Sequence, residues 1–117
     1  MSLRYVILHH TGVPEPHFDL MFETWDGSDL ATWRCTSWPI EAGTRVTRLK
    51  DHRRVYLSFE GDVSRGRGHV DRVAAGDCLV EIGADAVWRI SLLSGAPPLV
   101  LVLRAIEGQV WEASPQE

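Results

Sequence analysis

The sequence has few cysteines and no long hydrophobic segment. Its only two cysteines, Cys35 and Cys78, lie 43 positions apart among 117 residues. This spacing matches neither a zinc knuckle nor a Cys-x-x-Cys motif. The longest apolar run, residues 99–103, is far shorter than the ~20 residues needed to span a bilayer. The N-terminus does not resemble a signal peptide, because Arg4 and then a polar histidine pair follow too soon. We therefore expect a soluble, cytoplasmic protein without membrane contact.

The sequence also lacks an overall excess of positive charge. Its formal net charge of −4 at pH 7 argues against indiscriminate binding of nucleic acid over the whole surface. Residues 45–72 nevertheless contain eight basic and four acidic side chains, so this segment carries +4 and the remainder −8. A basic region on an acidic protein suits a confined polyanion site, although a solvated polar edge would look the same.

No segment has a helical hydrophobic period over three turns, and there is no repeat or interdomain linker. Short β-prone segments recur instead, separated by turns that contain glycine or proline. They are residues 5–8, 18–24, 31–38, 45–49, 55–59, 77–82, 87–93, 99–104 and 109–113. We expect one all-β domain over residues 1–117, a barrel or sandwich of about eight strands. We expect a loop at residues 60–68 and a frayed tail at residues 114–117.

Histidines gather near the N-terminus. Three of the five, His9, His10 and His17, fall within nine residues, and Asp19 follows. In an extended strand, His17 and Asp19 share one face, whereas the apolar residues between and after them share the other. Residues 12–16 favour a loop that folds His9 or His10 over the polar face. Two imidazoles and a carboxylate suit Mn, Fe or Zn, and three ligands leave positions open for substrate. Alternatively, these histidines are ordinary strand-end and loop residues.

A second polar group occupies residues 50–56. His52 and Tyr56 carry donors suited to a phosphate, and His52 can also act as a general acid. Four arginines in or near this segment are candidate phosphate-binding residues: Arg45, Arg48, Arg53 and Arg54. Strand parity puts the first two of these on opposite faces. The alternative interpretation is an edge strand whose polar face points to water, with its residues 55, 57 and 59 facing inward.

The two groups together resemble the 3'-phosphoesterase domain that occurs in bacterial DNA ligase D and as stand-alone proteins. That family shows Lys-His, a short loop and His-Tyr-Asp-Phe-Arg-Leu-Glu. A tryptophan strand ending in proline follows, then Glu-Asp-His, three residues, Tyr, and Phe-Glu-Gly. The matching segments here are His9-His10, residues 17–23 (HFDLMFE), residues 32–39, Lys50-Asp51-His52, Tyr56 and residues 59–61. The resemblance covers nearly the whole chain.

This resemblance implies a small closed or nearly closed β-barrel with a groove over one side. It implies a manganese-type ion, with zinc or another transition metal as alternatives, held by His10, His17 and Asp19. The loop is one residue longer than is usual in the family, so His9 remains an alternative to His10. His52 and Tyr56 would lie near the scissile phosphate. The implied reaction removes a 3'-phosphate or 3'-ribonucleotide from nucleic-acid ends, with a ligase or polymerase of end-joining repair as the implied partner.

The sequence departs from the family at two phosphate-contacting arginines. Met21 stands where the family has an arginine two residues after the metal-binding aspartate, and the second arginine aligns near Thr44. Losing one charge-assisted donor can cost on the order of 100-fold in rate. The alternative functions are therefore a non-catalytic metal-containing module that binds nucleic-acid ends, and a cupin-like small-molecule metalloenzyme suggested by His17-x-Asp19-x3-Glu23.

Overall fold

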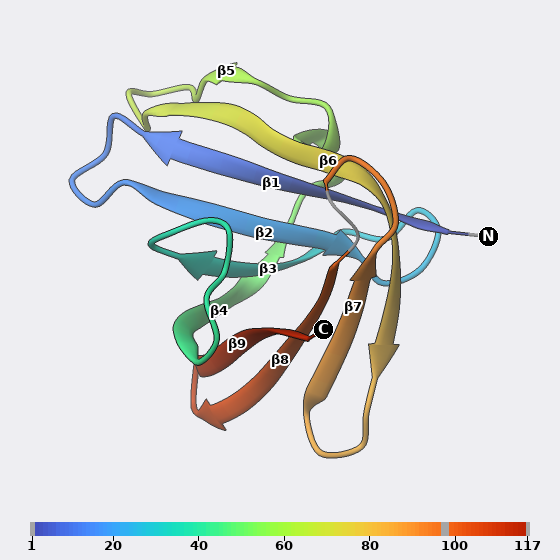
Figure 1. Cartoon of the computed structure of the whole chain (residues 1–117). Coiled ribbons are helices and arrows are strands. Elements are labelled where there is room, and N and C mark those ends of the chain that lie inside the picture. Colours follow the sequence, from blue (N-terminus) through green and yellow to red (C-terminus); the bar gives the residue numbers. More distant parts are fainter. Residues whose placement is uncertain (1, 97–98, 117) are drawn as a thin grey trace.

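The computed structural model describes residues 2–96 and 99–116 and consists almost entirely of β-strands (Figure 1). Among these residues, nine strands and one 3₁₀-helix are present. They are β1 (Leu3–Thr11), β2 (His17–Glu23), β3 (Leu30–Cys35), β4 (Thr44–His52), η1 (Arg54–Leu57), β5 (Gly61–Asp62), β6 (His69–Ile82), β7 (Val87–Leu92), β8 (Leu99–Glu107) and β9 (Val110–Gln116). The expected all-β class is confirmed. No helix among the described residues is long and apolar enough to cross a membrane.

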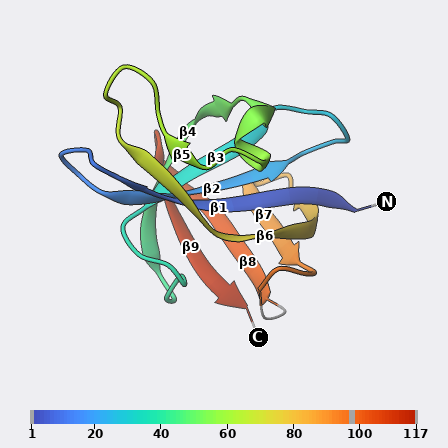
Figure 2. The same cartoon turned by 90° about the horizontal axis from the view of Figure 1, so that it is seen from above.

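Eight of the strands form a closed antiparallel barrel in the order β1-β2-β3-β4-β9-β8-β7-β6, and pairing of β6 with β1 completes the circle. The barrel consists of two meanders, β1–β4 and β6–β9, joined at the β4–β9 and β1–β6 seams (Figure 2). The 14-residue β6 pairs first with β1 and then with β7. In Figure 1 it follows β1 and then bends down beside β7. The two-residue β5 adds to the free side of β6.

The barrel interior is the main hydrophobic core. Alternation along each strand sends every second side chain inward, as the period of a half-buried strand requires. The largest fully buried side chains in it are Tyr5, Ile7, Leu20, Phe22, Trp33, Ile90, Leu92, Leu101 and Leu103. Cys35 and Cys78 are also buried there as free thiols. Burial raises the pKa of Cys35 to about 11 and that of Cys78 to about 12, so both remain protonated near neutral pH.

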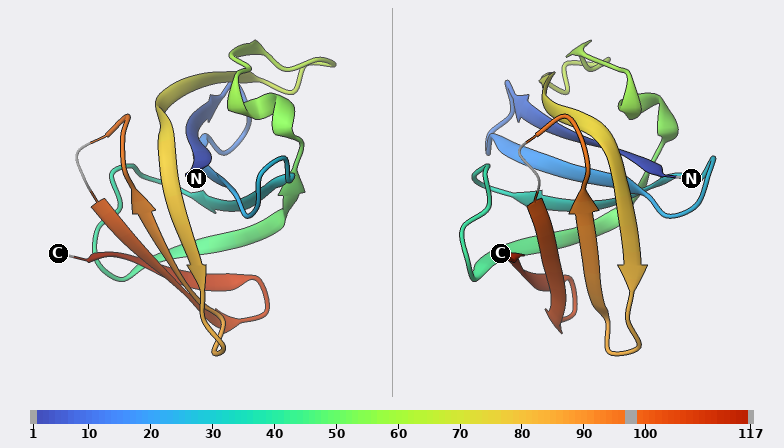
Figure 3. Two further views of the ribbon diagram at one scale, coloured as in Figure 1. Left: turned by 90° about the vertical axis from the view of Figure 1, so that its right-hand side faces the viewer. Right: turned by 45° about the vertical axis from the view of Figure 1, so that its right-hand side comes forward.

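A second, smaller core lies outside the barrel. The connection from β4 to β6 contains η1 and β5 and packs against the outer face of β1 and β2 (Figure 3). The buried residues of this outer core are Val6, Leu8, Met21, Leu30, Leu57 and Val70. Strands β1 and β2 are therefore buried on both faces, and the cavity described below lies between them and this connection.

The structure differs from three local expectations. Residues 55–59 are not a strand: Arg54–Leu57 form η1, with Tyr56 N–H donating to Arg53 O and Ser58 N–H to Val55 O, each at 3.2 Å. Only Leu57 of the three expected inward residues is buried, and Val55 is 52% exposed. The chain leaves β4 here and packs over the outer face of β1 and β2, where no neighbouring strand pairs with residues 55–59.

The other two differences concern segments expected to be irregular. The loop expected at residues 60–68 contains β5, which pairs with β6. The expected tail is ordered up to the last described residue, since residues 114–116 continue β9 and pair with residues 100–102 of β8. Ser114 Oγ also accepts a hydrogen bond from Gly43 N–H at 2.8 Å. Glu117, at the end of that expected tail, lies outside the described residues.

Arg48 packs against three tryptophans of the barrel core and does not line the cavity described below. Its guanidinium carbon lies 4.3 Å from the ring centroid of Trp33, 4.8 Å from that of Trp88 and 5.6 Å from that of Trp111. A guanidinium over an aromatic face is attracted by the ring quadrupole, and more strongly where water is excluded. Burial lowers the pKa of Arg48, although Asp51 acts in the opposite direction. This cation therefore stabilises the tryptophan cluster.

We expect Arg48→Ala to lower the free energy of unfolding by about 1–2 kcal/mol, because it removes a partly desolvated cation–π contact together with side-chain packing. Urea unfolding followed by circular dichroism measures the change. The control is Arg53→Ala, which removes the same charge from an exposed side chain. Equal stability of the two variants would contradict a stabilising role for the stack.

His69 links β5 to β6 at the edge of the connection. Its Nδ1 lies 2.9 Å from Asp62 Oδ1, and its Nε2 lies 3.0 Å from Asp71 Oδ1. Both ring nitrogens can donate only in the imidazolium form. The hydrogen bonds to Asp62 and Asp71 accordingly raise the pKa of His69 above its usual 6.5.

The stabilisation from His69 is fully present below the unfolded-state pKa and is lost as pH rises through the higher folded-state pKa. An NMR titration of the His69 ring should therefore give a pKa above 6.5 in the native protein. Asp62→Asn should move that pKa downward, whereas Asp85→Asn, in the β6–β7 turn, should leave it unchanged. An identical midpoint in the native protein and the Asp62 variant would show that the hydrogen bond between His69 and Asp62 does not form in solution.

Candidate active site

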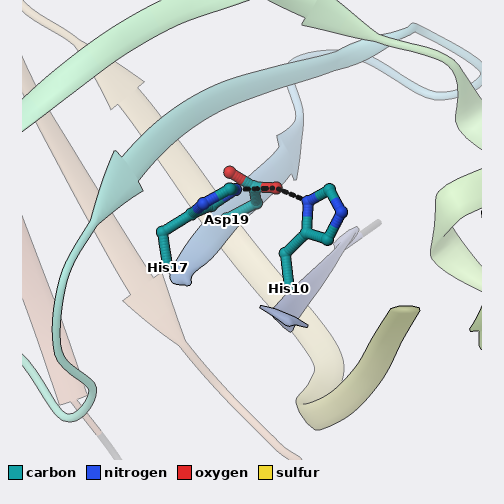
Figure 4. A group of neighbouring side chains, drawn as sticks. All are labelled: His10, His17 and Asp19. Atoms are coloured by element: carbon teal, nitrogen blue, oxygen red, sulfur yellow. Dashed lines mark ion pairs between the residues drawn. The ribbon is translucent and has the colours of Figure 1, made fainter. Parts of the chain in front are cut away.

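The structure places His10, His17 and Asp19 together at one end of the β1–β2 pair (Figure 4). His10 and His17 are register partners across the two strands, and Asp19 is on the same face of β2 as His17. One ligand atom from each residue lies within 4.8 Å of the others. Asp19 Oδ2 is 3.4 Å from His17 Nε2 and 4.0 Å from His10 Nδ1. The three side chains therefore converge on one point.

Backbone carbonyls orient both imidazoles. His17 Nδ1 lies 2.8 Å from Glu15 O, and His10 Nε2 lies 2.7 Å from Arg67 O. A carbonyl oxygen only accepts, so each of these nitrogens carries the hydrogen. In neutral rings this leaves lone pairs on His17 Nε2 and His10 Nδ1, the two atoms that face Asp19. Such outer hydrogen bonds are the usual way in which metal-binding histidines are held in one tautomer.

The burial of this group also suits a cation. The side chains of His17 and Asp19 are only 6% and 5% exposed. Among the described residues, no hydrogen bond reaches His17 Nε2 or Asp19 Oδ1. Buried polar atoms without a partner are costly, and a divalent ion would satisfy them. Two nitrogens and one carboxylate oxygen suit manganese, iron or zinc, so the residues present fit the ion that the sequence predicts.

His9 does not join this group. Its ring stacks on Phe18 with the centroids 4.3 Å apart and the planes at 9°. His9 therefore faces away from the side of the strands that carries His10. The loop length left His9 and His10 as alternative ligands, and the structure places His10 beside Asp19.

A cavity of about 160 Å³ opens beside the histidine–aspartate group. Its lining includes residues of both sequence motifs, and the full set is Leu8, His10, Asp19, Met21, Arg34, His52, Tyr56, Val63, Arg67 and Val70. The ring centroids of His52 and Tyr56 are 6.1 Å apart, and Tyr56 stacks on Phe59 at 5.9 Å. His52 Nδ1 lies 3.0 Å from Lys50 O, so the other ring nitrogen, Nε2, is the one available to a ligand.

The four candidate phosphate-binding arginines lie elsewhere, since none of them lines this cavity. Arg48 stacks on the tryptophans, Arg53 is exposed, and Arg45 Nη1 donates to Glu112 Oε2 at 2.8 Å. Arg54 donates to the Glu23 carboxylate and to Ser28 O. Burial raises the pKa of Glu23, but hydrogen bonds from Arg54 and from backbone N–H groups outweigh it, so the net shift is downward.

The cations that do line the cavity are Arg34 and Arg67, neither of which the sequence motifs single out. Arg34 is the register partner of Asp19 across β2 and β3. The Asp26-Gly27 turn and period-2 alternation could have placed Arg34 on the same face as Asp19. Arg67 belongs to the basic segment of residues 45–72, but no motif singles it out, because it lies in the irregular loop between β5 and β6.

Met21 forms part of the cavity wall as a core residue. Its side chain is 1% exposed and belongs to the outer core with Leu8, Leu57 and Val70. An arginine at this position would have to displace that packing before it could reach the cavity. Methionine at this position therefore suits the packing of residues 53–68 over β1 and β2.

No protein-family model matches the chain, and no curated protein sequence matches it significantly.

We expect the protein to bind one Mn²⁺ ion in isothermal titration calorimetry, because three oriented donors converge on one point. His17→Ala should weaken binding by more than the ~10–100-fold cost of losing an outer hydrogen-bond partner. His9→Ala is the matched control, since it removes an adjacent imidazole that stacks on Phe18. A larger loss for the His9 variant than for the His17 variant would contradict the assigned ligands.

Proposed function

We propose that this chain is a divalent-metal-dependent phosphoesterase of the DNA ligase D 3'-phosphoesterase type. Its substrates would be DNA or RNA ends that carry a 3'-phosphate or a 3'-terminal ribonucleotide. One observation carries the proposal: a single cavity is lined by His10 and Asp19 of the first motif and by His52 and Tyr56 of the second. These motifs are far apart in sequence, and their convergence beside a cluster of metal-ligand types supports a shared reaction.

The reaction places different demands on the two halves of the site. His10, His17 and Asp19 would hold the ion, which when bound supplies charge neutralisation at the phosphate and lowers the pKa of water. His52 Nδ1 donates to Lys50 O, so it is the imidazolium form of the ring that has a second proton, on Nε2, to give to a phosphoryl or leaving oxygen. The Tyr56 hydroxyl is a second donor, and stacking on Phe59 limits where its ring can move.

The size of the cavity favours a terminal group as substrate. At about 160 Å³ it is smaller than the pockets of roughly 300–1,000 Å³ that enclose whole drug-sized ligands. A phosphate with part of its sugar suits such a space, with the rest of the strand outside. The protein's net charge of −4 agrees with recognition of an end over a short stretch, since it disfavours a long electrostatic track.

A non-catalytic end-binding module is the second candidate. The observation that favours it is Met21, an apolar side chain in the cavity wall two residues after Asp19. A cupin-like enzyme is less well supported, because Glu23 binds Arg54 and Arg4 N–H and takes no part in the histidine–aspartate group. His52 lies in the same cavity as Asp19, which the cupin alternative does not require.

The test is incubation of the protein and Mn²⁺ with labelled primer-templates ending in a 3'-phosphate or a 3'-ribonucleotide. We expect release of phosphate or nucleoside and a 3'-hydroxyl product. His52→Ala should lower kcat by about 100-fold or more, as expected for loss of a general acid. His69→Ala, outside the cavity lining, should retain turnover. Binding of metal and of ends without any turnover would support the end-binding module and contradict the enzyme.

A further inference from the structure

Arg34 lies directly beside the metal-ligand group. It is the register partner of Asp19 on the neighbouring strand, and its Nε is 3.8 Å from Asp19 Oδ1. The two histidines face the other oxygen, Oδ2. The carboxylate therefore has imidazoles on one side and a guanidinium on the other.

The guanidinium of Arg34 has N–H groups that make no hydrogen bond to the described residues. Its side chain is 45% exposed, and its contact with Asp19 is too long for a hydrogen bond. Arg67, the other arginine of the cavity, is bound within its own loop, with Nε donating to Ser64 O at 2.9 Å and Nη2 to Ser64 Oγ at 3.0 Å. Among the arginines lining the cavity, Arg34 is thus the one whose guanidinium has no hydrogen-bond partner in the described part of the chain.

Arg34 also stands between two openings. It lines the cavity with His52 and Tyr56, and it lines a second cavity of about 190 Å³ with His17 and Arg45. On β3, Arg34 is the register partner of Asp19 on one side and of Thr47 on the other. Of the residues that line these two cavities, Arg34 alone is common to both.

We propose that Arg34 is the phosphate-binding cation of this site. The inference rests on the proposed phosphate-ester substrate. A guanidinium presents a planar fork of donors that matches two phosphate oxygens, and it stays charged at any working pH. Met21 has no donor to offer, so Arg34 supplies from β3 the positive charge that β2 lacks. The pairing with Asp19 keeps the charge beside the ion ligands, and the exposed donors remain for the ligand.

The test is fluorescence anisotropy with two single-stranded DNA oligonucleotides of one sequence, one ending in 3'-phosphate and the other in 3'-hydroxyl, in Mn²⁺. Every protein carries His52→Ala to suppress turnover. We expect the His52→Ala protein, in which Arg34 is intact, to bind the 3'-phosphate oligonucleotide more tightly than the 3'-hydroxyl one. Adding Arg34→Ala should reduce this ratio of affinities by about 10–100-fold. Arg34→Lys should recover part of it, because it keeps the charge without the fork. Arg104→Ala, which removes the same charge from an exposed side chain on β8, should leave the preference unchanged.

Calorimetry with Mn²⁺ distinguishes phosphate binding from a role in positioning Asp19. A lost preference with metal affinity unchanged supports the inference. An unchanged preference in Arg34→Ala overturns it, as does equal binding of the two oligonucleotides by the Arg34-containing protein. If the Arg34-dependent preference holds while protein with intact His52 releases no phosphate, the binding role stands and the proposed enzyme function fails. Turnover that is insensitive to Arg34→Ala would leave the enzyme proposal intact and remove Arg34 from it.

Discussion

The packing of residues 53–68 against the outer face of β1 and β2 is the contact on which the candidate site depends. It buries Met21 and Leu57 in the outer core, and it delivers the Arg67 carbonyl that orients His10. Gly68 permits this approach, because a Cβ there would meet His10 Nε2 at 3.0 Å and the residue has a φ of +91°. The same segment carries Tyr56 and directly follows His52. Its packing therefore both encloses the cavity and places these two residues in the cavity wall.

The parts of the structure that could be predicted from the sequence are those governed by strand alternation. Period-2 patterning indicates an all-β fold and places His17 and Asp19 on one face of β2. It failed at residues 55–59, where alternating residues form η1 because no strand is available to pair with them. The outer core was missed for a related reason: β2 has apolar residues on one face and Met21 on the other, and alternation alone indicates nothing packed over the second face.

The arginines show why charge in a sequence is a poor guide to where charge acts. Arg48 lies within the +4 segment, yet its guanidinium packs against the tryptophans of the barrel core. Arg54 lies beside His52 in sequence but binds the buried Glu23 carboxylate, which would otherwise carry an uncompensated charge. Arg34 lies outside that segment and reaches Asp19 through strand register. In each case the position of the guanidinium depends on desolvation or on strand register, and only the complete fold determines these.

The histidine–aspartate group imposes a cost on the fold that no other described residue relieves in full. His17 Nε2 and Asp19 Oδ1 are buried without hydrogen-bond partners, and Arg34 approaches only to 3.8 Å. Such a group would be selected against in a purely structural barrel, because apolar residues of similar size would pack there at lower cost. A ligand that binds these atoms only in the folded state would stabilise the protein by mass action. The unsatisfied atoms are therefore better explained by binding than by folding, whichever reaction follows.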